Sequence, residues 1–146
     1  GPDFVVGVRF SQGKVNDFEY KWPEKSKDAQ YTFEYISSLG VDYIHTTEFF
    51  ASAPAFNEGL SLSEFAKKYG NVPVIANGGI NNEKDAFELL CEHKADFLSI
   101  GKAALANPNW PTLVATNQQL TEFNFEMFNP IADLTTANEY LKNSAA

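Results

Sequence analysis

The chain has 146 residues, of which 44% are hydrophobic, and it carries a formal net charge of -8 with an isoelectric point near 4.7. This charge repels polyanions and anionic lipid surfaces, so we expect neither a nucleic-acid partner nor a membrane partner. No apolar stretch reaches the roughly 20 residues of a spanning helix, and the single cysteine fits a reducing compartment, so we expect a cytoplasmic protein.

The first predicted strand covers residues 4–9, a short β-branched run in which nearly every side chain is apolar. Such a run is typical of a strand buried on both faces of a parallel sheet. A polar loop over residues 10–27 follows it. We then predict a helix that Asp28 caps and Gly40 ends, and a second strand over residues 41–47.

The same alternation of apolar runs and amphipathic segments continues along the chain. On the third helix, the spacing of Cys91 from Phe87 predicts a cysteine buried by packing. The pattern as a whole predicts four βα units, an α/β fold with a parallel sheet. Its later elements are a helix over residues 61–69, a strand over 72–76, a helix opened by Asn82, a strand over 97–100 and a short helix over 103–106.

Four βα units are half of a (β/α)8 barrel, which needs about 250 residues. The chain is therefore either a smaller fold or part of such a barrel, and its βα units occupy residues 1–111. Residues 112–146 are predicted to form a tail that is rich in aromatic side chains, lacks a strand and contains a helix over residues 131–142.

Two glycine corners follow the third and fourth predicted strands. Gly78 and Gly79 form the first corner, and Gly101 with Lys102 forms the second. Parallel strands joined by one helix end at the same edge of a sheet, so the backbone N–H groups of both corners are expected to face one anion. Barrel phosphate sites form from the loops after the last two strands and a short extra helix. The sequence predicts such a site, with plain turn geometry as the alternative.

A few further side chains are candidates for chemistry. Arg9 ends the first strand, where it needs either a neighbouring carboxylate or an anionic or carbonyl-rich ligand. Lys102 is expected to meet a phosphate as a point charge, although a solvated lysine is the alternative. His45 on the second strand is more typical of a packing residue than of a catalytic base, and His93 is expected to be structural. We find no pattern of metal ligands and expect no metal site.

Three segments together resemble the Old Yellow Enzyme family of FMN-dependent NAD(P)H oxidoreductases. They are Val-Arg-Phe-Ser at 8–11, the run Val-Pro-Val-Ile-Ala-Asn-Gly-Gly-Ile at 72–80, and Gly-Lys-Ala-Ala-Leu-Ala-Asn-Pro-Asn-Trp-Pro at 101–111. The last is the most specific and argues against another phosphate-binding barrel enzyme, such as a sugar-phosphate isomerase. The family is a TIM (β/α)8 barrel, so the resemblance implies its C-terminal half, strands 5 to 8, followed by a C-terminal helical tail.

The resemblance also implies roles for the site residues. Arg9 matches an arginine that contacts the polar edge of the flavin ring. Gly78 and Gly79 match a loop whose backbone holds the FMN phosphate, and Gly101 with Lys102 matches a Gly-Arg pair that contacts the phosphate and the ring. Lysine in place of arginine keeps the charge but loses the planar fork, so its contact with phosphate is more secure than its contact with the ring.

The activity that the resemblance implies is hydride transfer from NADH or NADPH through FMN to an alkene, a quinone or a similar small-molecule acceptor. The family's substrate-anchoring pair and its proton-donating tyrosine lie upstream of the matching region. No catalytic residue is therefore assigned, and we expect the chain alone to be inactive. A non-catalytic half-barrel that binds a phosphorylated ligand is the alternative.

A half-barrel also needs a partner, because its open strand edges and one apolar sheet face invite association. We expect a homo-oligomer, or pairing with the missing N-terminal half, unless the aromatic tail around residues 123–128 folds back to cover the exposed face. The candidates for the apolar face, on one side of the sheet or the other, are Val5, Val74, Ile75 and Ile100.

Overall fold

The computed structural model describes residues 1, 3–14, 16–17 and 19–144, and the chain divides into two compact units, Gly1–Ser99 and Ile100–Ala146. Residues 15 and 18 of the predicted loop lie outside the described residues. Within the described part, no helix is long and apolar enough to cross a membrane.

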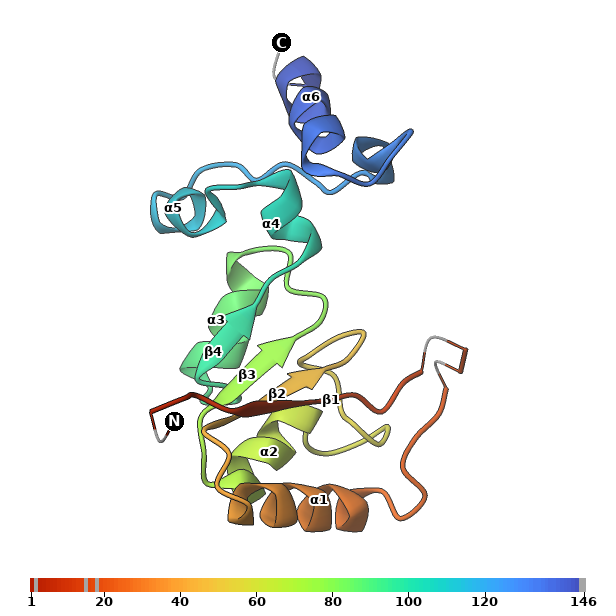
Figure 1. The fold of residues 1–146 in the computed structure, drawn as a ribbon, viewed down its shortest axis with the longest axis vertical. Helices are drawn as coiled ribbons and strands as arrows, with labels where there is room; N and C mark the ends of the chain where they lie inside the picture. Colours follow the sequence, from red (N-terminus) through yellow and green to blue (C-terminus); the bar gives the residue numbers. More distant parts are fainter. Residues whose placement is uncertain (2, 15, 18, 145–146) are drawn as a thin grey trace. The chain divides into compact units, whose positions relative to one another are not determined.

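The first unit alternates strands and helices (Figure 1). All neighbouring strands pair in parallel, in the spatial order β1-β2-β3-β4. The predicted α/β fold with four parallel strands is therefore confirmed. The elements are β1 (Gly7–Phe10), α1 (Ser26–Ser38), β2 (Tyr43–Thr47), α2 (Leu62–Gly70), β3 (Val74–Asn77), α3 (Glu83–Cys91) and β4 (Phe97–Ser99).

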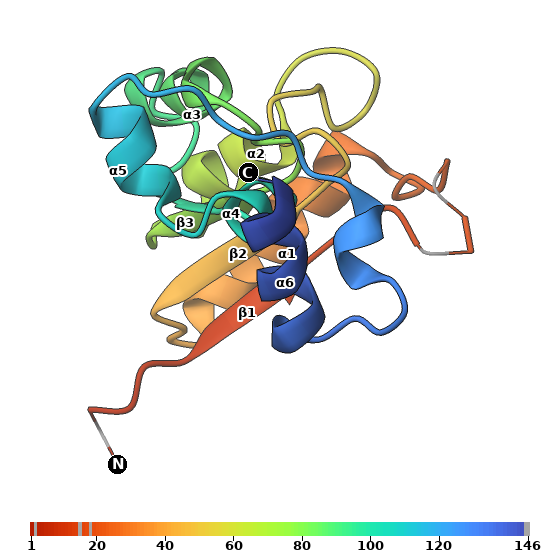
Figure 2. The same cartoon turned by 90° about the horizontal axis from the view of Figure 1, so that it is seen from above.

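The two faces of the sheet differ in their surroundings. On β2 and β3 every second side chain is fully or almost fully buried, and helices α1 and α2 lie on that side of the sheet (Figures 1 and 2). We call the other side the open face, because each of its residues is half-buried or exposed. The open face consists of Gly7, Arg9, Tyr43, His45, Thr47, Ile75, Asn77, Phe97 and Ser99.

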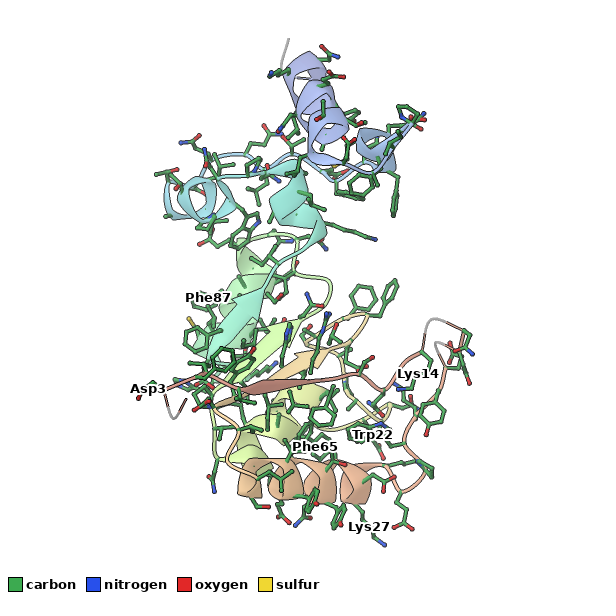
Figure 3. All side chains as sticks on the ribbon, viewed as in Figure 1. Asp3, Lys14, Trp22, Lys27, Phe65 and Phe87 are labelled. Atoms are coloured by element: carbon green, nitrogen blue, oxygen red, sulfur yellow. The ribbon has the colours of Figure 1, made fainter. Side chains whose placement is uncertain are left out.

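The hydrophobic core lies between the sheet and its helices. Phe33 of α1, Ile44 of β2 and Leu62 of α2 are at most 1% exposed, and burying one such side chain contributes about 1.5–3 kcal/mol. Trp22, from the long loop after β1, has its ring centroid 6.1 Å from that of Phe33. In the view of Figure 3, Trp22 and Phe65 lie between the sheet and α1. The loop thus packs against the core through Trp22.

Local signals set most helix ends. Ser61 and Glu64 form a capping box at the start of α2, and Asn82 caps α3 as predicted. The prediction for α1 was wrong in one respect. This helix begins at Ser26, and the carboxylate of Asp28 accepts a hydrogen bond from the backbone N–H of Glu24 at 2.8 Å instead of capping the helix.

The prediction of a buried Cys91 was also wrong, because the cysteine is exposed at the last residue of α3. Phe87, labelled in Figure 3, is 62% exposed on the same helix. The buried stripe of α3 consists of Ala86 and Leu89. The spacing of four residues correctly placed Phe87 and Cys91 on one side of α3. That side is exposed, and the core lies on the side of Ala86 and Leu89.

The four residues predicted as candidates for an exposed apolar sheet face do not lie on one face in the structure. Val74 is fully buried on the helix side, and Val5 precedes β1. Ile75 lies on the open face, where Phe97 of β4 is its register partner and is 59% exposed. Ile100 is half-buried at the start of the second unit. The open face is thus mixed, because polar side chains of β1, β2 and β3 share it.

The second unit is helical in its described residues. Its elements are α4 (Lys102–Ala106), α5 (Trp110–Ala115), the 3-10 helix η1 (Phe125–Phe128) and α6 (Leu134–Ser144). The side-chain amide of buried Asn107 donates to the carbonyls of Ala103 at 2.9 Å and Thr121 at 2.8 Å, which joins α4 to the segment after α5. The predicted domain boundary between residues 111 and 112 stays a prediction.

Candidate functional site

A chain of polar side chains occupies the carboxyl edge of the open face. Arg9 Nη2 donates to Thr47 Oγ1 at 3.1 Å and to Asn77 Oδ1 at 3.4 Å. The Thr47 hydroxyl donates to Asn77 Oδ1 at 2.6 Å, and the Asn77 amide donates to the Ser99 carbonyl at 2.7 Å. One residue from each of the four strands thus takes part in a single network.

Arg9 is the only arginine of the chain, and its side chain is exposed. The oxygens that hold its guanidinium belong to a hydroxyl and an amide, both of which are neutral. None of the ion pairs among the described residues involves Arg9. The neighbouring carboxylate, one of the two expected partners, is thus not found among the described residues, and a ligand as the partner of Arg9 stays a prediction.

His45 is the register partner of Arg9 on β2. Its Nε2 atom is buried and has no hydrogen-bond partner among the described residues. Burial lowers the pKa of His45 below its ordinary value of 6.5, and the positive charge of Arg9 lowers this pKa further. The imidazole is therefore neutral at pH 7, which avoids a second positive charge beside Arg9.

This pairing predicts how His45 titrates. Arg9→Gln should raise the pKa of His45 but leave it below 6.5, because burial is the larger cause. Since the folded-state pKa is lowered, the stability that His45 contributes is present above pH 6.5 and is lost as the pH falls through the folded-state value. Proton NMR of the imidazole ring measures the pKa of His45 in the wild type and in Arg9→Gln, with His93→Gln to assign the signals. A His45 pKa at or above 6.5 would contradict the prediction.

The first glycine corner has a geometric reason for both glycines. Gly78 has a φ of 135°, and a Cβ there would overlap the carbonyl oxygen of Glu48. Gly79 has a φ of 64°, and its Cβ would lie 2.7 Å from the Phe50 ring. The Gly78 carbonyl accepts a hydrogen bond from Ala51 N–H at 2.9 Å. Turn geometry, the alternative left open by the sequence, therefore accounts for these two glycines.

The same corner leaves donors free. The backbone N–H groups of Gly78, Gly79 and Ile80 donate to no acceptor among the described residues. The corner borders a pocket of about 250 Å3 that is also lined by Phe50, Ser52 and the start of α3. This volume is smaller than the roughly 300–1,000 Å3 of pockets that enclose whole drug-sized ligands. The pocket can take a small group of a ligand, and successive free N–H groups suit an anionic one.

The second corner belongs to the second unit, where it starts α4. A Cβ on Gly101 would meet open space, and its φ of -100° is not in the left-handed region, so neither overlap nor a positive φ requires glycine there. The Lys102 ammonium lies 4.9 Å from the ring centroid of Phe125 and 5.8 Å from that of Phe123. These cation–π contacts were not foreseen from the sequence, and the phosphate role of Lys102 stays a prediction.

Two residues of the site were missed in the sequence. Thr47 and Asn77 end their strands on the side that also carries Arg9, but hydroxyl and amide side chains at strand ends are common. The one available signal was the position of Asn77, directly before the first glycine corner. Among the described residues, no group of three or more histidine, cysteine, aspartate or glutamate side chains is placed to hold a metal ion.

A sequence profile of the NADH:flavin oxidoreductase / NADH oxidase family matches residues 1–121. The chain belongs to this family. Within the flavin oxidoreductases, the NADH:fumarate oxidoreductase of Klebsiella pneumoniae (strain 342) is 28% identical over 128 residues, which cover 82% of this chain and 13% of the relative. The 12-oxophytodienoate reductase-like protein of Solanum lycopersicum is 31% identical over 116 residues, which cover 79% of this chain and 31% of the relative.

Solved structures of flavin oxidoreductases share the fold. Morphinone reductase in complex with tetrahydroNAD matches 90% of this chain with a TM-score of 0.63 and 21% identity. The old yellow enzyme homologue from Zymomonas mobilis matches 92% with a TM-score of 0.68 and 22% identity. The chain spans 32% and 37% of these two structures. Its four βα units are thus part of an Old Yellow Enzyme barrel.

Proposed function

We propose that this chain is the FMN-binding half of an NAD(P)H-dependent flavin oxidoreductase, and that its units are strands 5 to 8 of the barrel. The observation that carries the proposal is the exposed Arg9 guanidinium, which neutral oxygens hold at the carboxyl edge of β1. Barrel enzymes place their chemistry at that edge. Family membership supplies the class of reaction.

The residues present fit the polar parts of FMN. Arg9 offers a positive fork to the carbonyl-rich edge of the flavin ring, and the free N–H groups of Gly78 and Gly79 suit the phosphate. For Gly101 and Lys102 the support is the sequence resemblance. Bound FMN would supply hydride transfer from NADH or NADPH to an alkene, a quinone or a similar acceptor.

A flavin titration tests this proposal. FMN added to the chain should lose fluorescence as it binds, and Arg9→Gln should weaken its affinity about tenfold to a hundredfold, as expected for a hydrogen bond to a charged group. Lys27→Gln removes the same charge from the exposed surface of α1 and serves as the control. The proposal fails if FMN does not bind, or if Arg9→Gln and Lys27→Gln bind FMN equally well.

The second candidate is a non-catalytic half-barrel that binds a phosphorylated ligand. The small pocket at the first glycine corner favours it, because that pocket accommodates a phosphate-sized group. Competition separates the two candidates. Ribose 5-phosphate should displace FMN only weakly if the ring contacts of Arg9 matter, and it should bind as tightly as FMN if the phosphate alone is recognised.

We further propose that a second copy or the missing N-terminal half covers the open face. β1 and β4 each lack a neighbour on one side in the described sheet, and Phe97 is exposed on β4. Sedimentation at micromolar concentration should give a mass near twice 16.2 kDa. Phe97→Lys should lower it, whereas Phe87→Lys, at an equally exposed phenylalanine of α3, should not. A compact monomer at this concentration would rule out the dimer.

A further inference from the structure

We propose that Thr47 and Asn77 are positioning residues, which hold the only guanidinium of the chain in one orientation before any ligand binds. The inference rests on the proposed function, because it concerns how Arg9 is made ready for FMN. It assigns roles to two side chains that reach Arg9 from β2 and β3.

The Asn77 amide has one orientation that its neighbours allow. Its Oδ1 atom accepts hydrogen bonds from both Arg9 and Thr47, while its amide N–H donates to the Ser99 carbonyl. A flipped amide would turn its N–H groups toward the guanidinium donors and its oxygen toward a carbonyl oxygen. The contact with β4 thus fixes the acceptor that faces Arg9.

The hydroxyl of Thr47 both accepts and donates a hydrogen bond. Oγ1 accepts from Arg9 at 3.1 Å and donates to Asn77 at 2.6 Å, so it links the two residues. Valine has nearly the same shape but can make neither bond. Because β-branched side chains are stiff at χ1, the hydroxyl is held in place at little entropic cost.

The neutrality of both residues matters as much as their geometry. A carboxylate in either position would pair with Arg9 and cancel its charge. The hydroxyl and the amide engage only Nη2, and the other guanidinium donors have no acceptor among the described residues. Arg9 is thereby ordered without being neutralised, which is what recognition of a carbonyl-rich or anionic ligand requires.

The flavin-free chain provides the direct test, because Arg9 gives the only arginine guanidinium signals in its NMR spectrum. In the wild type we expect slow rotation of the guanidinium and separate Nη signals. Thr47→Val and Asn77→Ala should average them. Thr46→Val is the matched control, the same substitution on the same strand at a side chain on the helix side of the sheet, and it should leave them separate.

The FMN titration gives a second readout. Asn77→Ala and Thr47→Val should each weaken FMN binding about fivefold to tenfold, as expected for one or two lost hydrogen bonds, and neither should add to the effect of Arg9→Gln. Asn77→Asp should keep Arg9 ordered yet also weaken FMN binding, because it cancels the charge.

The outcomes separate the two proposals. Averaged Arg9 signals in the wild type, or separate signals in both Thr47→Val and Asn77→Ala, overturn the positioning role whatever FMN does. If the flavin-free spectra behave as expected but Arg9→Gln binds FMN as the wild type does, the positioning of Arg9 stands and the proposed flavin role of Arg9 fails.

Discussion

Gly78→Ala is expected to destabilise the first unit by about 3 kcal/mol or more. The new Cβ would stand at a φ of 135° and overlap the carbonyl oxygen of Glu48. That carbonyl belongs to a backbone segment fixed on both sides, by the hydrogen bonds from Glu48 N–H to Asn77 at 3.0 Å and from Ala51 N–H to Gly78 at 2.9 Å. The backbone cannot give way as the end of a flexible side chain would. Urea unfolding followed by circular dichroism measures the loss.

Two other glycines separate the causes of this loss. Gly40 also has a positive φ, 79°, but a Cβ there meets open space, so Gly40→Ala should cost only about 1 kcal/mol for backbone strain. Gly101→Ala meets neither a positive φ nor an overlap and should cost less than either of the other two substitutions. If Gly78→Ala is no more destabilising than Gly40→Ala, the close approach of residues 48–51 does not restrict position 78 to glycine.

The alternation of strands and helices was predictable because it depends on patterns within a few residues. The Asn82 cap is an example, since an asparagine followed by acidic residues in the first helical turn favours a helix start wherever it occurs. The parallel order followed in turn, because a helix between two strands brings the second strand alongside the first in the same direction.

The faces of the elements were less predictable. The run at residues 72–76 is apolar at every position, so the sequence does not show whether Val74 or Ile75 points toward the helices. The pairing register with β2 and the packing of α2 decide this, and both depend on residues far away in the chain. Cys91 was misplaced for a similar reason, because the third helix has apolar residues on more than one side.

Some residues of the candidate site were predictable from the sequence and others were not. Arg9 was recognisable as a strand-end arginine, but its partners lie 38 and 68 residues further along the chain. Only the register of three strands brings Thr47 and Asn77 to it. The contacts of Lys102 with Phe123 and Phe125 also join distant residues, and no local pattern indicates them.

The chain alone is expected to oxidise NADH or NADPH no faster than free FMN does, with quinones or enones as acceptors. Rate enhancements of a million-fold or more require an oriented hydride donor, an oriented acceptor and a positioned proton donor. The family resemblance places the last two upstream of the matching region, and this chain spans 32% to 37% of two solved relatives. Steady-state assays at a fixed FMN concentration, with and without the chain, measure the difference.

Flavin-dependent turnover well above that of free FMN would contradict this prediction and would require a proton donor within the chain. Tyr43 and His45 are then the residues to replace, because both lie on the open face of β2 and His45 is the register partner of Arg9. The lowered pKa of His45 makes its imidazole neutral at pH 7, so a donor role for it should strengthen as the pH falls. Loss of that turnover in Tyr43→Phe but not in His45→Gln would identify the tyrosine as the proton donor.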